Sequence, residues 1–262
     1  MARTPEQRRN EILRVLKEKD YADFGYLGEL FQVSQMTIRR DIERLEKKGM
    51  VDRIYGGVKL RTEPSYEATI QERLKTNQRE KQAIAKLAAQ HIHNGDVIAF
   101  DGSTTAIEVS KAIKDRKNLT VITNNISIAI ELSTAPDIQT VLLGGFVRNS
   151  SLSLVGAVVE QSLRSFYIDK AFISSKALDD EAGLTDFTVA EGEAKKALIQ
   201  KSNQVYVMVD HTKLGKLSFF QVMNADQIDT IITDQVKPLT AEQKRCIQSF
   251  REKGVNVMIS KG

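Results

Sequence analysis

The stretch VSQMTIRRDIERLEKKG, residues 33–49, packs eight charged side chains around a narrow apolar stripe and ends in glycine. Three apolar side chains share one sector of a helical wheel: Ile38, Ile42 and Leu45. Ser34 stands just before the helical pattern, where a hydroxyl can accept a hydrogen bond from the first turn near Thr37. The pattern predicts a helix that buries one thin seam and exposes a face rich in arginine.

The residues before this stretch also have helical spacing. A first helix is indicated by apolar residues three or four apart within 12–16. A short second helix is predicted over 24–31, with Asp23 as its N-cap. A tight polar break at 32–34 leads into the arginine-bearing helix. Two helices joined by so short a turn, the second of them basic, form a helix-turn-helix, whose second helix fits the major groove of DNA.

A hairpin is predicted after the arginine-bearing helix. Residues 51–55 alternate like a strand, a Gly-Gly pair supplies the turn, and residues 58–60 alternate again. A basic hairpin in this place is a wing, and it predicts phosphate contacts by Arg53 and Lys59. The competing interpretation is a solvated surface helix followed by an ordinary hairpin. The DNA-binding hypothesis assigns base or phosphate contacts to seven residues: Ser34, Gln35, Thr37, Arg39, Arg40, Arg53 and Lys59.

The charge distribution agrees with a basic head on a neutral body. Residues 1–61 contain 14 Lys and Arg against 10 Asp and Glu, whereas residues 62–262 contain 24 of each kind. The whole net charge of +4 therefore sits in the first quarter of the chain, as expected for a polyanion-binding domain. A surplus of four charges also arises by chance, so the charge distribution alone does not establish a polyanion-binding domain.

Length and composition limit the remaining classes. A chain of 262 residues, 41% hydrophobic and 27% charged, favours two folded domains over a disordered chain. No apolar run reaches the roughly 18–20 residues of a membrane span, and the polar start predicts no signal peptide. The single cysteine, Cys246, cannot form an internal disulfide, which favours a reducing, cytoplasmic location. His91 and His93 cannot share one helix face and no cysteine cluster accompanies them, so no metal site is expected.

Domain boundaries follow from the changes in pattern. We predict a winged helix-turn-helix domain at 1–61, a linker at 62–76 and an effector-binding and oligomerisation domain at 77–262. Asn77, followed three residues later by Glu80, resembles a capping box that starts the first helix of the larger domain.

The larger domain alternates short apolar runs with amphipathic helical patterns. Strands are predicted at 97–100, 119–123, 138–143, 168–173, 205–209, 230–232 and 255–259. Helices are predicted between several of them, at 104–113, 127–132, 156–166, 189–201 and 241–253. This alternation indicates an α/β domain with a mainly parallel sheet covered on both faces. Ligands of such sheets bind beyond the carboxyl ends of the strands.

The strand end VIAFDGSTTAIEV, residues 97–109, has the chemistry best suited to a ligand. Gly102 permits close approach of the backbone, three hydroxyls follow at 103–105, and the helix that begins there directs N–H groups outward. This combination suits a phosphate, although serine and threonine also cap helices that bind nothing. Other predicted strand ends and one helix start add polar groups that suit a phosphorylated polyol: Asn124, Arg148, Lys195 and Lys213.

These motifs resemble those of a known family. VSQMTIRRDIERLEKKG followed by VDRIYGGV resembles the DNA-binding signature of the DeoR family of bacterial sugar-metabolism regulators. GDVIAFDGSTT, LTVITNN, LLGG and VMVDHTKLG resemble the effector domain of that family, so the likeness covers nearly the whole chain. That domain is similar to ribose-5-phosphate isomerase and related sugar-phosphate enzymes. The resemblance implies that it binds a phosphorylated sugar without transforming it, through these residues: Asp101, Ser103, Thr104, Thr105, Asn124, Lys195 and Lys213.

The same resemblance bears on catalysis. Residues 173–176, Ile-Ser-Ser-Lys, stand where the isomerases have paired aspartates, so the obvious general base is missing. Asp179 and Asp180 lie close enough to keep an enzyme in contention.

Two hypotheses therefore stand at the level of sequence. We expect a repressor of a sugar or polyol operon, a homodimer or larger oligomer that needs no cofactor and leaves duplex DNA when it binds a sugar phosphate. The alternative is a sugar-phosphate isomerase or deaminase-like enzyme with an N-terminal interaction module.

Overall fold

The computed structural model describes residues 5–19, 21–47, 51–54, 56–60 and 68–262. The chain divides into two compact units, Met1–Glu67 and Ala68–Gly262, each of which is described by itself. Residues 62–67 of the predicted linker, and Arg61 before them, lie outside the described residues. The rest of the predicted linker contains the short helix α4 (Ile70–Lys75), which belongs to the larger unit. In the described ranges, no helix is long and apolar enough to cross a membrane.

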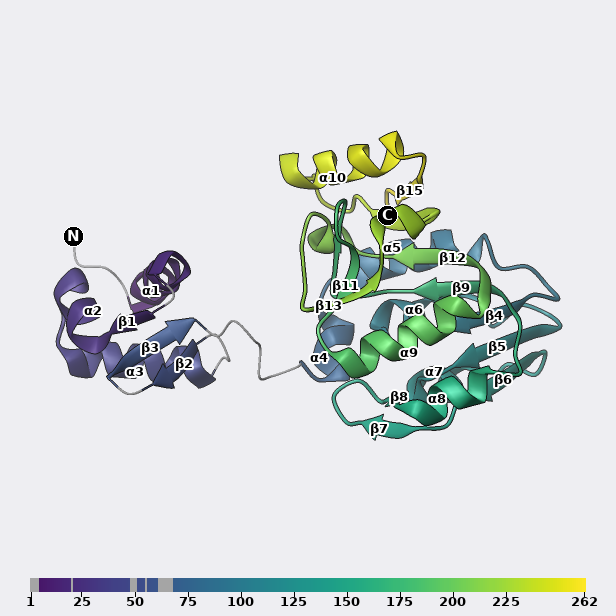
Figure 1. Ribbon diagram of the computed structural model, residues 1–262, viewed down its shortest axis with the longest axis horizontal. Coiled ribbons are helices and arrows are strands. Elements are labelled where there is room, and N and C mark those ends of the chain that lie inside the picture. Colours follow the sequence, from purple (N-terminus) through teal and green to yellow (C-terminus); the bar gives the residue numbers. More distant parts are fainter. Residues whose placement is uncertain (1–4, 20, 48–50, 55, 61–67) are drawn as a thin grey trace. The chain divides into compact units, whose positions relative to one another are not determined.

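The described residues of the smaller unit form three helices and a three-stranded antiparallel sheet (Figure 1). The helices are α1 (Pro5–Lys19), α2 (Phe24–Phe31) and α3 (Gln35–Lys47), and the strands are β1 (Tyr21–Asp23), β2 (Val51–Ile54) and β3 (Gly57–Leu60). The strand order is β1-β3-β2. The predicted winged helix-turn-helix is confirmed, with β1 as an addition that is too short to show an alternating pattern.

One core holds these elements together. It takes apolar side chains from all three helices and from the sheet: Ile12, Leu16, Ala22, Phe24, Leu27, Phe31, Ile38, Ile42, Leu45, Val51 and Val58. Both predicted N-caps are present, because Asp23 Oδ1 accepts from Tyr26 N at 2.8 Å and Ser34 Oγ accepts from Thr37 N at 3.2 Å.

A buried ion-pair network joins α1 to α3. Arg8 Nε lies 2.6 Å from Asp41 Oδ2, and Arg9 Nη1 lies 3.2 Å from Asp41 Oδ1. Asp41 is only 4% exposed. The acidic residue of the TIRRD sequence is therefore structural: it fixes α3 against α1 and leaves the adjacent arginines outside.

The larger unit is built on a seven-stranded sheet in which every neighbouring pair is parallel. The strand order is β15-β14-β12-β9-β4-β5-β6. The strands are β4 (Val97–Phe100), β5 (Leu119–Thr123), β6 (Ile138–Leu142), β9 (Ile168–Ile173), β12 (Ser202–Met208), β14 (Thr230–Asp234) and β15 (Asn256–Ser260). All seven predicted strands are present, and the predicted parallel α/β domain is confirmed.

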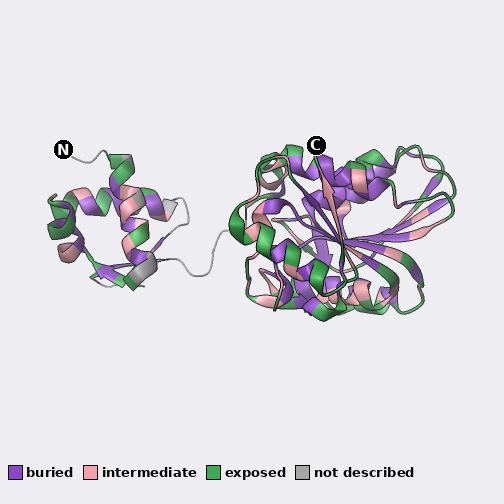
Figure 2. Cartoon of the chain, turned by 90° about the horizontal axis from the view of Figure 1, so that it is seen from above, coloured by how far each residue is buried: buried purple, intermediate pink, exposed green. Residues whose placement is uncertain are grey.

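Helices cover both faces of this sheet, and each face has its own core. On one face lie α5 (Gln78–Ala89), α6 (Thr104–Ala112) and α7 (Ile126–Leu132); on the other lie α8 (Ala157–Leu163), α9 (Val189–Gln200) and α10 (Ala241–Glu252). Figure 2 shows the buried strands running between helices whose outward faces are exposed. This arrangement brings the carboxyl ends of β4, β5, β9 and β12 to one edge of the sheet.

Short antiparallel elements surround that edge, and the sequence pattern did not predict them. Strands β7 (Phe146–Arg148) and β8 (Ser153–Val155) form a hairpin. Strands β10 (Ala177–Asp179), β11 (Gly183–Asp186) and β13 (Phe220–Met223) form a small sheet. Two single turns of 3-10 helix, η1 (His211–Lys213) and η2 (Ala225–Gln227), complete the loops. These five strands have three or four residues each and, unlike β4, no continuous apolar run, so the sequence pattern does not reveal them.

The predicted capping box at Asn77 is wrong. Asn77 has the left-handed backbone angle φ of 50° and makes no side-chain cap. Its amide instead donates to Asp210 Oδ1 and Thr212 Oγ1, at 3.1 and 3.2 Å. The capping box lies eight residues earlier, at the start of α4, where Thr69 and Glu72 bond reciprocally.

Candidate DNA-binding surface and candidate effector site

Helix α3 presents the predicted arginine face. Ile38 and Ile42 are fully buried, whereas Arg39 and Arg40 are exposed. The Arg39 guanidinium lies over the ring of Phe24, 4.9 Å from its centroid, which holds it at the helix surface. Arg40 has no recorded partner within the described part of the chain, so its guanidinium is available to a ligand.

The remaining candidates of this surface lie at the start of α3 and on the wing. Ser34 and Gln35 are exposed and Thr37 is half-buried, and the Ser34 and Thr37 hydroxyls lie 3.0 Å apart. Arg53 of β2 lies 6.0 Å from the Phe24 ring centroid and 3.6 Å from Glu43, so it meets Arg39 beside one aromatic ring.

The structure does not bring Lys59 to Arg53. In the hairpin Arg53 pairs with Val58, whereas Lys59 pairs with Asp52. Paired residues share a face of the sheet, whereas successive residues of one strand lie on opposite faces. Arg53 and Lys59 therefore lie on opposite faces of the wing, and only Arg53 continues the surface of α3.

The candidate effector site begins with a buried carboxylate at the end of β4. Asp101 is 0% exposed. It accepts hydrogen bonds from Ser103 Oγ at 2.6 Å and Ser174 N at 3.2 Å, and it lies 3.5 Å from Lys195 Nζ. Burial raises the pKa of Asp101, although Lys195 and these hydrogen bonds oppose the rise. Asp101 thus organises the site and ties three elements together.

Lys195 is the positive centre of this network. Its Nζ pairs with Asp186 of β11 as well as with Asp101. Burial alone would lower its pKa, but Asp186, Asp101 and Glu191 raise it overall, so the ammonium stays charged. The sequence predicted Lys195 near the start of a helix. It did not predict that Asp186 would pair with this lysine.

Two buried polar atoms at the same edge have no hydrogen-bond partner among the described residues: Thr105 Oγ1 and Asn124 Oδ1. Both residues are only 1% exposed. Thr104 and Thr105 open α6, whose cap is Ser103 Oγ, 3.1 Å from Ala106 N. Buried polar groups without a partner are uncommon, and a hydroxyl and an amide oxygen at a helix start point to a polar ligand.

Gly102 is required by packing against the protein itself. A Cβ at this position would lie 2.7 Å from Ser153 Cβ, so the β7–β8 hairpin closes directly on the loop. In this structure the group that approaches Gly102 closely is Ser153; the approach of a ligand to this glycine stays a prediction.

Arg148 stands on that hairpin and is paired. Its Nη1 lies 2.7 Å from Glu191 Oε1, and Glu191 also accepts from Ser151 and Ser153. Glu191 is buried in the first turn of α9. Arg148 therefore fixes the hairpin to α9 at the rim of the site.

Lys213 enters from the opposite side, in η1 after β12. Its Nζ lies 3.2 Å from Ser174 Oγ and 3.8 Å from Asp210 Oδ2. Burial is the main cause that lowers the pKa of Lys213; Lys195 and Arg73 lower it further, whereas Asp210 and Asp101 raise it. The Lys213 side chain is half-buried, at 22% exposed, and an ammonium whose pKa is lowered by its surroundings is stabilised by an anion beside it.

Two further cations, which the sequence pattern did not predict, lie near Lys213: Arg73 of α4 and Lys81 of α5. Lys81 is 4% exposed, and its pKa is lowered to about 8 by burial and by Lys213 and Arg73. Both residues thus belong electrostatically to the same cluster as Lys213. Sequence spacing gave no signal for Lys81, because a lysine in an amphipathic helix is ordinarily placed in solvent.

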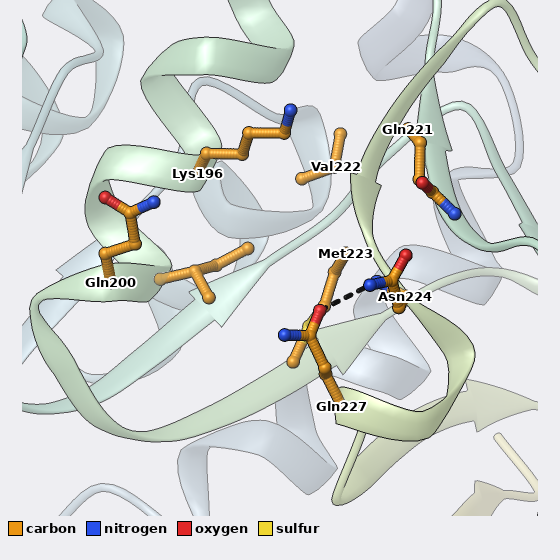
Figure 3. Close-up of a pocket in the computed structure, with 8 residues that line it drawn as sticks. Lys196, Gln200, Gln221, Val222, Met223, Asn224 and Gln227 are labelled. Atoms are coloured by element: carbon orange, nitrogen blue, oxygen red, sulfur yellow. Dashed lines mark hydrogen bonds between the residues drawn. The ribbon is translucent and has the colours of Figure 1, made fainter.

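A separate groove lies on the outer side of α9. It has a volume of about 330 Å³ and lies between α9 and the segment β13–η2. Figure 3 shows Lys196 and Gln200 on α9 facing Gln221, Asn224 and Gln227 across it. Lys196 lies 4.3 Å from the Phe220 ring centroid. Lys195, the preceding residue, pairs with Asp101 and Asp186 at the sheet edge, so the groove and the candidate effector site are separate.

Asp179, one of the two carboxylates considered for catalysis, is engaged in a turn. Asp179 Oδ1 accepts hydrogen bonds from the backbone N–H groups of Glu181 and Ala182, at 3.0 and 2.9 Å. It thereby shapes the turn between β10 and β11. At the place of the isomerase aspartates, Ser174 and Ser175 are buried and bonded to Asp101 and Asp186.

A winged helix-turn-helix joined to a parallel α/β domain with a polar site at its strand ends defines a DNA-binding transcriptional regulator with a sensor domain. Comparison with known proteins gives the family. The model described as the DeoR-like helix-turn-helix domain matches residues 8–63, and the model described as the DeoR C terminal sensor domain matches residues 76–235. The chain therefore belongs to the DeoR family.

Individual relatives agree with this assignment. The chain is 34% identical over 257 residues to the HTH-type transcriptional regulator GolR of Listeria innocua, covering 98% of this chain and 99% of that protein. It is 30% identical over 237 residues to the glycerol-3-phosphate regulon repressor of Escherichia coli, covering 90% and 94%. A ribose 5-phosphate isomerase from Methanocaldococcus jannaschii matches 54% of this chain and 57% of that chain, with a TM-score of 0.41 and 18% identity.

Proposed function

We propose that this regulator represses a sugar or polyol operon and is released from DNA by a phosphorylated sugar intermediate. One observation supports the effector most directly. Lys195, Lys213, Lys81 and Arg73 interact electrostatically at one sheet edge, where Thr105 Oγ1 and Asn124 Oδ1 are buried without partners. Cations suit a phosphate, and an amide oxygen and hydroxyls suit the hydroxyls of a sugar.

In the DNA complex, α3 would lie in the major groove. Thr37, Arg39 and Arg40 would approach base edges, because they lie on the outward face and arginine recognises guanine with two parallel hydrogen bonds. Ser34, Gln35 and Arg53 would contact the flanking backbone. Lys59, on the other face of the wing, would contact phosphate only if the wing enters the minor groove or straddles the backbone.

In the effector complex, Lys213 would bind the phosphate together with the N–H groups and hydroxyls of residues 103–105. Asn124 would accept from a sugar hydroxyl. Asp101, Gly102, Arg148 and Lys195 would hold this arrangement, since their charged groups or surfaces already contact the protein. The relative named glycerol-3-phosphate regulon repressor supports a phosphorylated effector of this kind.

We infer further that the chain is a regulator and not an enzyme. The buried serines after β9 and the turn-forming role of Asp179 support this, and so do relatives named as transcriptional regulators. The default assembly is a symmetric dimer, because most DNA half-sites are paired about 34–36 Å or a multiple apart. A regulator that acts on DNA works where the DNA is, which supports a cytoplasmic location.

A thermal-shift screen with phosphorylated sugars tests the effector site. A ligand present at 100 times its dissociation constant stabilises the protein by about 2.7 kcal/mol. We expect Ser103→Ala combined with Lys213→Ala to abolish this stabilisation, whereas Lys216→Ala, an exposed lysine three residues away, leaves it unchanged. Stabilisation that survives the double substitution would show that the effector binds elsewhere. Rapid turnover of the sugar phosphate by the purified protein would favour the enzyme.

A further inference from the structure

Lys81 holds the end of the first helix of the larger unit. Its Nζ donates hydrogen bonds to the carbonyl oxygens of Arg73 and Thr76, which are among the last carbonyls of α4 and its C-cap. Helix α4 is the first described element after residues 61–67, through which the chain arrives from the DNA-binding unit. A single buried ammonium thus stabilises the helix at which the larger unit begins.

The same ammonium has no carboxylate of the described residues in direct contact, and Asp210 and Glu108 act on it only from farther away. Within the described part of the chain, no carboxylate lies within ion-pairing distance of Lys81 Nζ. Lysine has three donors, and the recorded hydrogen bonds use two of them. A buried charge without a partner is costly, so the remaining donor favours an anionic acceptor.

The loop that contains Lys213 is bonded to the same place. Asn77, at the junction of α4 and α5, donates to Asp210 and Thr212 on either side of His211. Lys213 follows one residue later and is the largest charged influence on Lys81. The α4–α5 junction is therefore in contact with the loop after β12, which contains Lys213.

We propose that Lys81 is a further ligand of the effector phosphate and that it couples phosphate binding to the order of helix α4. The proposal rests on the sensor function proposed above. A phosphate between Lys213 and Lys81 relieves the repulsion between the two ammonium groups and occupies the third donor of Lys81. The ammonium is then fixed, and its two bonds to the α4 carbonyls are fixed with it.

This coupling gives the effector a differential interaction with two states of the molecule. In the state with bound phosphate, the anion neutralises the Lys81 ammonium, and its hydrogen bonds order α4. In the state without phosphate, no anion neutralises this ammonium, and α4 is less well ordered. A ligand shifts such an equilibrium only by its difference in affinity for the two states. Helix α4 has six residues, too few for stability on its own, so its order depends on contacts such as these.

The experiment uses the full-length chain with inorganic phosphate as the probe. Phosphate affinity is measured by calorimetry, and hydrogen exchange of the α4 amides is followed with and without saturating phosphate. Four proteins are compared: the natural sequence, Lys81→Met, Lys81→Gln, and Lys86→Met as a control on an exposed face of the same helix. Lys81→Gln keeps amide donors for the two carbonyls, so it remains informative if Lys81→Met does not fold.

We expect both Lys81 variants to bind phosphate at least about tenfold more weakly, the effect of losing one charge-assisted hydrogen bond. We also expect phosphate to slow exchange in α4 of the natural protein and of Lys86→Met, but not of the Lys81 variants. Unchanged phosphate affinity would overturn Lys81 as a ligand. Weaker binding with undiminished protection of α4 at saturation would overturn the coupling.

Two further results would show whether the sensor function or only the role of Lys81 is wrong. If neither inorganic phosphate nor any phosphorylated sugar binds the natural protein, the proposed sensor function fails and the role of Lys81 falls with it. If phosphate binding is lost with Lys213→Ala but is unaffected in both Lys81 variants, the sensor site stands and only the role of Lys81 is wrong.

Discussion

The lysines at the sheet edge differ in which groups of the protein neutralise their positive charge. Lys195 lies between Asp186 and Asp101, and its charge is structural. Lys213 has Asp210 at 3.8 Å, whereas Lys81 has backbone carbonyls alone. The less a buried cation is paired in the protein, the more a bound anion stabilises it. The proposed phosphate site is accordingly at Lys213 and Lys81 and not at Lys195.

Phosphate affinity should fall as the pH rises. The pKa of Lys81 is lowered to about 8, chiefly by burial, then by Lys213 and Arg73, while Asp210 and Glu108 raise it. The charged form binds phosphate, so affinity is fully present below about pH 8 and is lost above it. We expect a loss of up to about tenfold per pH unit. Lys213, whose pKa is also lowered, contributes to the same slope.

Calorimetry from pH 8 to 9.5 measures this dependence, with Lys81→Arg as the matched variant. Arginine remains charged throughout this range, so the slope should become shallower. An equally steep slope in Lys81→Arg would assign the titration to Lys213 or another group.

Arg40 is the residue whose loss should harm DNA binding most cleanly. It is exposed and unpaired among the described residues, so its removal leaves the core intact. We expect Arg40→Ala to weaken binding to a duplex selected from a random library by about tenfold or more. Arg245→Ala, an equal charge change on the exposed face of α10, is the control. Equal affinities of the two variants, measured by fluorescence anisotropy, would contradict the assignment of α3 as the recognition helix.

Side-chain types and spacing predicted Asp101, Ser103, Thr105 and Asn124 as neighbours at one sheet edge. Asp101 and Asn124 directly follow two strands, and Ser103 and Thr105 lie at the start of the helix after the first of them. Lys81 and Glu191 were not predicted. Both are charged residues on helices, where the sequence gives no sign that the charged face is turned inward. Lys81 is buried against a carbonyl of the α4–α5 junction, a segment without a clear sequence pattern. Glu191 is buried against the hydroxyl of Ser151, which lies 40 residues earlier in the chain.

In the smaller unit, the packing of α1 against α3 includes a buried ion-pair network. Asp41 is buried between Arg8 and Arg9. Removing one partner of a buried ion pair leaves the other charge uncompensated, at a cost of about 3 kcal/mol or more. We expect Asp41→Ala to unfold the small unit at a lower temperature and leave the transition of the larger unit unchanged. Calorimetry of the full chain separates the two transitions.

Asp41→Asn is the control for that prediction. It keeps the shape and one acceptor, so its loss of stability should be smaller than that of Asp41→Ala. Equal stability of Asp41→Ala and the natural protein would mean that the apolar seam of α3 suffices without the ion pairs.

The β7–β8 hairpin should be sensitive to the loop on which it rests. In Gly102→Ala the new Cβ would lie 2.7 Å from Ser153 Cβ, closer than the atoms can approach. We expect the hairpin to be displaced, with the Glu191 contacts to Ser151 and Ser153 weakened and phosphorylated-sugar binding lost. Thermal shift checks the binding, and a crystal structure checks the hairpin. Full binding by Gly102→Ala would show that the hairpin does not shape the site.

Long elements were predictable and short ones were not. The seven strands of the main sheet have continuous apolar runs, and their helices have apolar stripes, because each buries a face against the sheet. Strands β1, β7, β8 and β10 have only three residues each, and tertiary contacts decide their conformation. The misplaced capping box has the same cause: the side chain of Asn77 bonds to the loop after β12 and not to its own helix.

In the proposed mechanism, DNA binding by the smaller unit and effector binding by the larger unit are coupled through thermodynamic linkage. If the effector lowers the affinity for DNA by some factor, DNA must lower the affinity for the effector by the same factor. Coupling of this kind typically amounts to about 5–150-fold. We expect reciprocal titrations to give equal factors, and unequal factors would indicate aggregation or a third state.

The most direct test of the central claim is fluorescence anisotropy of a selected duplex bound to the full-length protein, titrated with phosphorylated sugars and with the same sugars lacking phosphate. The account predicts that at least one phosphorylated sugar releases the DNA, that its unphosphorylated form does not, and that Ser103→Ala with Lys213→Ala binds the DNA but no longer responds. Release by the unphosphorylated sugar, or by a phosphorylated sugar in the double variant, would contradict it.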